Sequence, residues 1–319
     1  MQLIQSIYKG VDQFFFKPST QKNLSFFRIA IGLFCIIQTI SIFPDLLNIY
    51  GANGLIRSEI LQILTPDLLP KVSWFSSWVA PLGISEPSSI YFLACLFIFV
   101  SIGLTLGFAT RYMAFLAWFI NLMFYGTGNV FSYGADGFLN ICLFYCIIMP
   151  VGYYWSVDSL FSEKNKKPHL GNTAFTRFLQ IHLAIAYFMG GFCKILGYQW
   201  WNGEAIWRAV MFPSFNQFDM SWMASYPEVS MVLGWGVLLM EILYPFLMFY
   251  RKTRPFCLVG IIGMHIGIAL FMGLHFFALI MIILNIATFG WPYIEGWLQR
   301  FRSEDKAVEA PKAIITQKY

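Results

Sequence analysis

The chain has 319 residues, of which 58% are hydrophobic and 19% aromatic, while only 12% carry a charge. Soluble domains carry about 25% charged residues, so this composition excludes a soluble globular protein and predicts an integral protein of the lipid bilayer. The net charge of +5 is small, and the basic residues cluster in short loops. They point to membrane topology, with no nucleic-acid partner.

The first residues predict a helix that lies in the membrane interface. Residues 1–16 place apolar side chains on one helix face and include Lys9 among the polar ones, as interfacial amphipathic helices do. They lack the order of charged, apolar and small residues that marks a cleavable signal peptide.

Eight apolar segments follow. A helix needs about 20 apolar residues to cross the hydrocarbon core. The segments that meet this length predict an all-α polytopic membrane helix bundle: 24–43, 90–109, 112–129, 137–155, 174–196, 229–250, 255–272 and 274–293. Pro150 is expected to kink the fourth segment near one end.

Lysine and arginine placement predicts the topology. These residues precede the first segment, follow the eighth, and occupy each connection from an even-numbered segment to the next odd-numbered one. The remaining connections are acidic or neutral. The positive-inside rule therefore predicts a multi-pass membrane protein with both termini in the cytoplasm.

Two long outer connections and the C-terminal end complete the predicted organisation. Residues 56–79 and 197–222 are rich in tryptophan and phenylalanine, which favours interfacial helices on the outer side of the bundle. Residues 295–319 predict a polar cytoplasmic tail, disordered from about residue 303. The expected parts are thus 1–16, a membrane domain over 17–294, and 295–319.

The few ionisable residues within apolar segments are the candidates for chemistry, because a charge at bilayer depth costs several kcal/mol. Lys194 ends the fifth segment and is followed by Trp200, Trp201 and Glu204. It fits a lysine that snorkels to the interface and, equally, a desolvated amine that acts as a general base. Gly190 and Gly191, one turn earlier, allow close approach of a helix or a flat ligand.

Glu241 and His265 lie near the middles of the sixth and seventh segments. If these helices are neighbours, the pair can form a structural clasp, which we favour, or a proton relay. Asp136 fits an N-cap and is also a candidate partner of Lys194. Arg28 can snorkel or pair with a buried carboxylate, and His182 fits a polar packing residue.

The sequence predicts no metal site. Cys142 and Cys146 share a helix face, but two small packing residues explain them better, and zinc-site spacing is absent.

Several motifs together resemble the HTTM domain, the membrane domain shared by vitamin K-dependent gamma-glutamyl carboxylase and many bacterial proteins. They occur in family order over about residues 17–294: Phe27-Arg28-Ile29-Ala30-Ile31-Gly32, Gly134-Ala135-Asp136-Gly137 with Met149-Pro150, Tyr187-Phe188-(x)2-Gly191-(x)2-Lys194 followed by Trp200-(x)2-Gly203-Glu204-Ala205, and Glu241-(x)3-Pro245 with Arg251-Lys252-Thr253-Arg254 and His265.

The resemblance implies a function. In the carboxylase, the lysine that matches Lys194 is held to deprotonate vitamin K hydroquinone. A bacterial HTTM enzyme would accordingly use a quinone, with Lys194 as base, Asp136, Glu204 and His265 in support, and Gly190, Gly191, Trp200 and Trp201 shaping the ring site. The carboxylase's large lumenal region has no counterpart in this sequence. The first alternative is therefore a non-catalytic accessory factor for maturation or export of a secreted peptide or for a periplasmic partner protein. The second is a proton-coupled transporter that relays through Glu241 and His265, although no internal repeat supports it.

Overall fold

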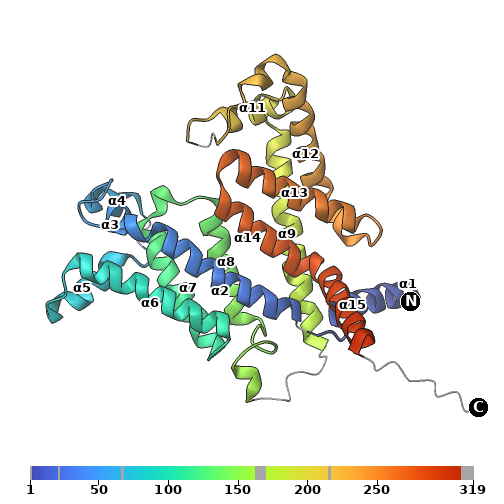
Figure 1. Cartoon of the computed structure of the whole chain (residues 1–319), viewed down its shortest axis with the longest axis horizontal. Coiled ribbons are helices and arrows are strands. Elements are labelled where there is room, and N and C mark those ends of the chain that lie inside the picture. The colour runs from blue at the N-terminus through green and yellow to red at the C-terminus, as the bar shows by residue number, and fades with distance from the viewer. Residues whose placement is uncertain (1, 21, 66–67, 162–169, 215–216, 310–319) are drawn as a thin grey trace, which may run out of the picture.

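The protein is all-helical in its computed structural model, which describes residues 2–20, 22–65, 68–161, 170–214 and 217–309 (Figure 1). No β-strand occurs within these ranges. The helices are α1 (Gln2–Phe16), α2 (Lys22–Ile42), α3 (Leu46–Tyr50), α4 (Ser58–Leu64), α5 (Val72–Val79), α6 (Glu86–Leu106), α7 (Thr110–Thr127), α8 (Gly134–Ile148), α9 (Leu170–Ile195), α10 (Tyr198–Trp201), α11 (Glu204–Met211), α12 (Pro227–Phe249), α13 (Arg254–Met272), α14 (His275–Asn285) and α15 (Trp291–Glu309).

Each of the eight predicted apolar segments contains a helix, but the fourth, 137–155, is helical only as far as Ile148. Among the described residues, six helical stretches are long and apolar enough to cross a membrane: Lys22–Tyr50, Glu86–Leu106, Gly171–Ile195, Pro227–Phe249, Arg254–Met272 and His275–Arg300. Helices α7 and α8 are not among these six, so the count of eight spans is not confirmed. The 15 residues of α8 extend about 22 Å at 1.5 Å per residue, short of the hydrocarbon core of about 30 Å.

The helices form two neighbouring groups. In one, α2 packs against α6, which contacts α7, and α7 contacts α8. In the other, α9 packs against α12, α12 against α13, and α13 against α14. Helix α14 also contacts α2 and α8, and so joins the groups into one bundle. In Figure 1 the start of α12 and the short helix α11 extend beyond the rest of the bundle.

Arg28 joins three chain segments at one end of the first group. Its side chain is fully buried, and it donates hydrogen bonds of 2.6–2.7 Å to the carbonyls of Leu104, Thr105 and Trp155. The last carbonyls of α6 have no partner within their own helix, and the guanidinium supplies one. The sequence offered two predictions for Arg28, snorkelling and pairing with a buried carboxylate. Neither describes these contacts, because its hydrogen bonds go to backbone carbonyls.

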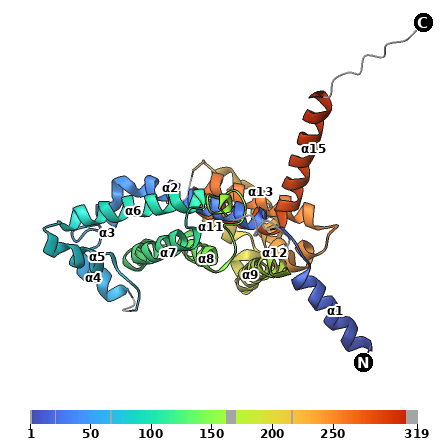
Figure 2. The same ribbon diagram turned by 90° about the horizontal axis from the view of Figure 1, so that it is seen from below.

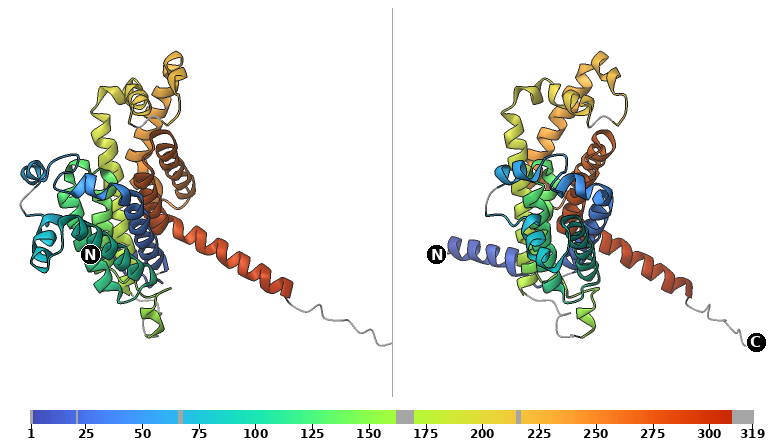
Figure 3. Two further views of the ribbon diagram at one scale, coloured as in Figure 1. Left: turned by 60° about the vertical axis from the view of Figure 1, so that its left-hand side comes forward. Right: turned by 90° about the vertical axis from the view of Figure 1, so that its left-hand side faces the viewer.

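The start of the first span and the last helix meet at this end of the molecule. Lys22 of α2 forms an ion pair with Glu295 of α15, and Asn23 donates a hydrogen bond to the carbonyl of Ala287. From there α1 and α15 leave the bundle in different directions (Figures 2 and 3). Within the predicted helix over residues 1–16, the described residues Gln2–Phe16 form α1.

Two sequence predictions are wrong in this part of the fold. Helix α8 ends at Ile148, so Pro150 follows the helix and does not kink it; a proline restricts the residue before it, and helices commonly end there. The expected tail is also helical as far as Glu309, because α15 continues through residue 303. Residues 310–319 lie outside the described ranges.

The two outer connections are helical, as the sequence predicted. Residues 56–79 contain α4 and α5, and residues 197–222 contain α10 and α11. Helix α5 packs against α6 and α7, whereas α10 and α11 pack against α12. These short helices therefore sit against the span helices that flank them.

Candidate functional site

Helices α9 and α12 approach each other closely because of a glycine. A Cβ atom added at Gly191 would lie 2.8 Å from Cγ1 of Ile242 and 3.0 Å from the Cβ of Glu241, distances that side chains do not tolerate. Such small residues let membrane helices pack backbone to backbone. The contact sets the register of α9 on α12 and brings Lys194 alongside Glu241.

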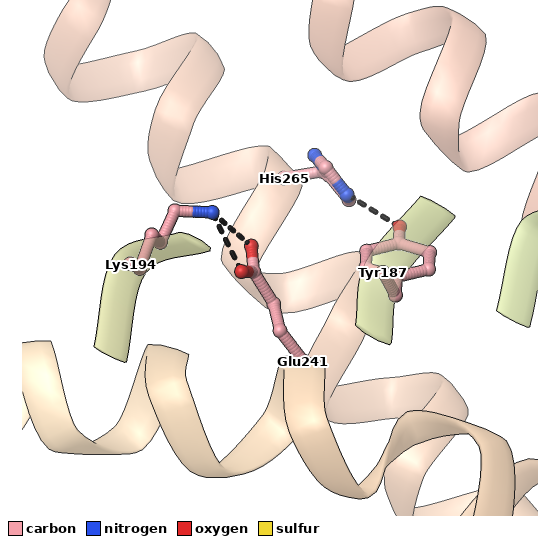
Figure 4. Close-up of polar contacts among 4 residues, drawn as sticks. All are labelled: Tyr187, Lys194, Glu241 and His265. Carbon is pink, nitrogen blue, oxygen red and sulfur yellow. Dashed lines mark hydrogen bonds and ion pairs between the residues drawn. The ribbon is translucent and has the colours of Figure 1, made fainter. Parts of the chain in front are cut away.

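Lys194 and Glu241 form a bidentate ion pair (Figure 4). The Nζ atom of Lys194 lies 2.7 Å from Oε1 and 2.6 Å from Oε2 of Glu241. The carboxylate side chain is 9% exposed and the lysine side chain 28% exposed, so one partner is buried and the other is partly accessible. The Nζ atom also lies 5.4 Å from the ring centroid of Trp200, a cation–π distance.

Glu241 lies well inside the helical length of α12, whereas Lys194 is the second-last residue of α9. Glu241 is 14 residues after Pro227 and 8 before Phe249, or about 21 Å and 12 Å from these ends at 1.5 Å per residue. A lone charge at such a depth is expensive. Mutual neutralisation explains how the bundle holds both groups there.

A second polar group lies next to the ion pair and includes Tyr187 and His265 (Figure 4). The hydroxyl of Tyr187 is 2.6 Å from Nε2 of His265 and accepts a 2.8 Å hydrogen bond from Nδ2 of Asn285. The hydroxyl of Tyr244 donates to Oδ1 of Asn285 at 2.7 Å, and the rings of Tyr187 and Tyr244 stack with centroids 4.2 Å apart. All four side chains are buried.

The hydrogen bond between the Tyr187 hydroxyl and Nε2 runs in the direction that the tautomer of His265 sets, because the phenol oxygen has lone pairs for both Asn285 and the imidazole. The second ring nitrogen of His265 is Nδ1. That Nδ1 is buried and has no hydrogen-bond partner among the described residues. Tyr244 and Asn285 were not among the predicted site residues. Uncharged polar residues within apolar helices are the sequence signal that would have found Asn285.

The predicted clasp between Glu241 and His265 is not formed. Both oxygens of Glu241 bind Lys194, and Nε2 of His265 binds Tyr187. Helices α12 and α13 are neighbours as expected. Their rotations direct the two side chains to different partners, which hydropathy alone does not reveal.

Asp136 lies in a different place from the ion pair. It is the third residue of α8, and its Oδ2 accepts a 3.0 Å hydrogen bond from the backbone N–H of Tyr133. The predicted N-cap assignment is therefore wrong: Asp136 reaches back to the cap from the third position, as in a capping box. Its Oδ1 accepts from Gln38 of α2, and it lines a cavity whose lining does not include Lys194.

Glu204 also lies apart from the ion pair. It starts α11, and its Oε1 accepts hydrogen bonds from Nε and Nη2 of Arg208 one turn later. These hydrogen bonds from Arg208 lower the pKa of the Glu204 carboxyl. Trp201 lies nearby, where its ring N–H donates to the carbonyl of Ile195.

Two further predicted residues are His182 and Gly190. His182 forms a 3.0 Å hydrogen bond through Nδ1 with the hydroxyl of Tyr145. A Cβ at Gly190 would meet Oε2 of Glu241 at 3.5 Å and Nζ of Lys194 at 3.7 Å, so this glycine leaves the ion pair uncovered on one side. In the described part of the chain, no group of three His, Cys, Asp or Glu side chains comes together as a metal site.

The HTTM domain family matches residues 16–291, which is nearly the whole bundle from the end of α1 to the start of α15. This chain belongs to the HTTM domain family. The match confirms the resemblance read from the sequence motifs. The HTTM domain here contains both the Lys194–Glu241 ion pair and the Tyr187–His265 network, and its apolar helices make it a multi-pass integral membrane protein. No solved structure matches the chain.

Proposed function

We propose that this HTTM protein is a membrane enzyme of the vitamin K-dependent-carboxylase-like kind, in which Lys194 takes a proton from a hydroxyl of a lipid-soluble quinol. The observation that carries the proposal is the Lys194–Glu241 ion pair, with the amine partly accessible and the carboxylate buried. Paired charges inside apolar helices mark functional pathways in membrane proteins.

The Lys194–Glu241 pair can supply the unprotonated amine that a general base requires. A general base must be unprotonated when it acts, and an ion-paired lysine carries its proton. Transfer of that proton from Nζ to the carboxylate, across the 2.6 Å contact, gives a neutral amine beside a neutral carboxylic acid. This transfer leaves the net charge of the pair at zero, so the low-dielectric surroundings do not oppose it as they oppose an isolated charge.

The residues around the pair fit a flat ring compound. Gly190 presents no side chain toward the pair, and Trp200 places an indole ring near Nζ. A quinone bound there would supply the oxidation–reduction chemistry. Gly190 would leave room for the ring, Trp200 would contact it, and Lys194 and Glu241 would bind or exchange the proton of its hydroxyl.

The test uses the full chain purified in detergent. Organic extraction and mass spectrometry first establish whether a quinone is bound. The rate of oxidation of a reduced, short-chain menaquinone analogue in air-saturated buffer is then compared for wild type, Lys194→Ala, Lys194→Arg and Glu241→Gln. We expect bound quinone in wild type and loss of turnover in all three variants, because arginine preserves the charge but cannot give up its proton.

Arg208→Ala is the matched control, since it removes a cation from the exposed surface of α11 away from the ion pair. It should turn over as wild type does. Full activity in Lys194→Ala would overturn the assignment of Lys194 as the base.

We further propose that the protein lies in a bacterial inner membrane with both termini in the cytoplasm. The ion pair between Lys22 and Glu295 supports this, since it brings the start of the first span and the last helix to one end. Fluorescent-protein fusions that mature only in the cytoplasm should fluoresce at both termini. A dark fusion at one terminus alone would contradict the proposal.

A second candidate function is an accessory factor for maturation or export of a secreted peptide. Exposed apolar side chains on the outer connections favour it: Ile63 is 84% exposed and Trp78 65% exposed. This candidate predicts a stable complex with a peptide precursor that persists in Lys194→Ala. Loss of the complex in that variant would favour the enzyme.

A further inference from the structure

A cavity of about 160 Å³ lies among the ends of α2, α7 and α8, apart from the ion pair of α9 and α12. Its lining includes the polar residues Gln38, Thr39, Asn121, Ser132 and Asp136, together with Phe276 of α14. A cavity of about 150 Å³ in another protein holds a benzene molecule. This one therefore has room for a small organic molecule.

Asp136 is the only acidic residue in the described lining of the cavity. Burial raises the pKa of its carboxyl, and an ammonium ion bound beside it would favour the ionised form. No lysine, arginine or histidine belongs to its described lining, and among the described residues no ion pair involves Asp136. Its two oxygens each accept one hydrogen bond, from Gln38 and from the N–H of Tyr133, so each keeps a further lone pair for a donor. Burial, and then the charge of Asp136, raise the pKa of Tyr133 to about 12, so this phenol adds no charge.

Asn121 adds a neutral acceptor. Its Nδ2 donates to Oδ1 of Asn140 at 2.7 Å. This bond uses the amide N–H of Asn121 and leaves its own Oδ1 as an acceptor. The polar lining thus combines a carboxylate with an amide oxygen.

The walls are aromatic. Tyr50, Phe124, Tyr125 and Phe131 line the cavity together with Phe276, and the rings of Tyr50 and Phe124 lie 4.9 Å apart at their centroids. The faces of such rings carry negative potential that attracts cations, which is how proteins recognise ammonium groups. A carboxylate within an aromatic enclosure matches a cation that is both charged and apolar.

We propose that this cavity binds a small organic ammonium ion, with Asp136 as its counter-ion and the surrounding rings as its walls. Such an ion can come from a free amine or from the headgroup of an aminolipid, and the chemistry of recognition is the same. The site is separate from the Lys194–Glu241 pair, so the inference does not depend on the proposed quinol chemistry.

The test is equilibrium binding to the detergent-purified full chain. The probes are radiolabelled choline and ethanolamine, and 3,3-dimethylbutan-1-ol, the uncharged carbon analogue of choline, is the competitor. We expect a saturable site for at least one cation, no competition by the neutral analogue, and at least tenfold weaker binding in Asp136→Asn. Asp45→Asn is the matched control, because Asp45 is exposed, lies outside the lining and bonds only Asn48 among the described residues; its binding should equal that of wild type.

A second variant guards against misfolding of the first. Gln38→Lys places an ammonium group on the chain at a position whose side chain already lies 2.9 Å from Oδ1 of Asp136. It should abolish binding of the probes while keeping a monodisperse protein with a melting temperature at or above that of wild type.

Competition by short-chain lipids identifies where the bound ammonium ion comes from. Competition by dihexanoyl phosphatidylethanolamine, but not by dihexanoyl phosphatidylglycerol, would support the site and identify a lipid headgroup as the source of the ion. If neither lipid competes with a bound cation, the site is supported and the source of the ion is a free amine. Binding of neither cation, equal displacement by the neutral analogue, or undiminished binding in folded Asp136→Asn would overturn the proposal.

Discussion

The ion pair between Lys194 and Glu241 should respond unequally to removal of its two partners. We compare Lys194→Met with Glu241→Gln, each of which removes one charge and nearly preserves side-chain length. Removing one partner of a buried ion pair costs about 3–5 kcal/mol, because the other charge is left buried and unpaired. The structure decides which removal is worse.

Lys194→Met strands the more deeply buried group. The Glu241 side chain is only 9% exposed and has no other hydrogen-bond donor among the described residues, so we expect a loss of about 3 kcal/mol in the free energy of unfolding. Glu241→Gln strands a lysine that is 28% exposed, lies beside Trp200 and can extend toward the interface. We expect that loss to be about 1–2 kcal/mol.

The double variant Lys194→Met/Glu241→Leu should recover most of the loss, because apolar replacement of a whole buried ion pair is often neutral or stabilising. Equilibrium unfolding by SDS in mixed micelles, followed by the fluorescence of the 11 tryptophans, measures all three variants. Equal losses of unfolding free energy in Glu241→Gln and Lys194→Met would contradict this ranking. So would a double variant that loses the sum of the two single losses.

Three further predictions use the same unfolding titration or NMR. Gly191→Ala should lower the free energy of unfolding by about 1–3 kcal/mol through overpacking, because its Cβ would come within 2.8 Å of the neighbouring helix. Gly190→Ala, whose Cβ would have its nearest atom at 3.5 Å, should leave the free energy of unfolding unchanged or raise it by up to about 1 kcal/mol. Equal losses in the two variants would contradict this expectation. Arg28→Met should cost more than about 3 kcal/mol, since several buried carbonyls lose their donor, and an unfolding curve like that of wild type would refute it. Arg208 lowers the pKa of Glu204. The contribution of this pair to stability is therefore complete above the ordinary carboxyl pKa and is lost as the pH falls through the folded-state pKa. Arg208→Ala should raise the pKa of Glu204 in a ¹³C NMR titration, and an unchanged pKa would contradict the assignment.

The sequence by itself determined the class and the outline of this protein. A backbone in lipid must satisfy its own hydrogen bonds, so long apolar segments had to become helices, and each of the eight predicted segments contains one. The cost of burying charge likewise selected Lys194 and Glu241 as exceptional, and the ordered motifs placed the chain in its family. Hydropathy did not fix the number of spans, because α8 is apolar but too short to cross unaided.

The partners of these side chains were decided only by the tertiary structure. The sequence paired Glu241 with His265, whereas the bundle pairs Glu241 with Lys194, 47 positions earlier in the chain, and directs His265 to Tyr187. It also named Asp136 as a candidate partner of Lys194, whereas the structure places Asp136 in a separate aromatic cavity. Hydropathy records how deep a residue lies but not the direction in which its helix turns it. That rotation follows from close contacts between helices, such as that of Gly191 with Ile242, which arise only when distant segments pack together.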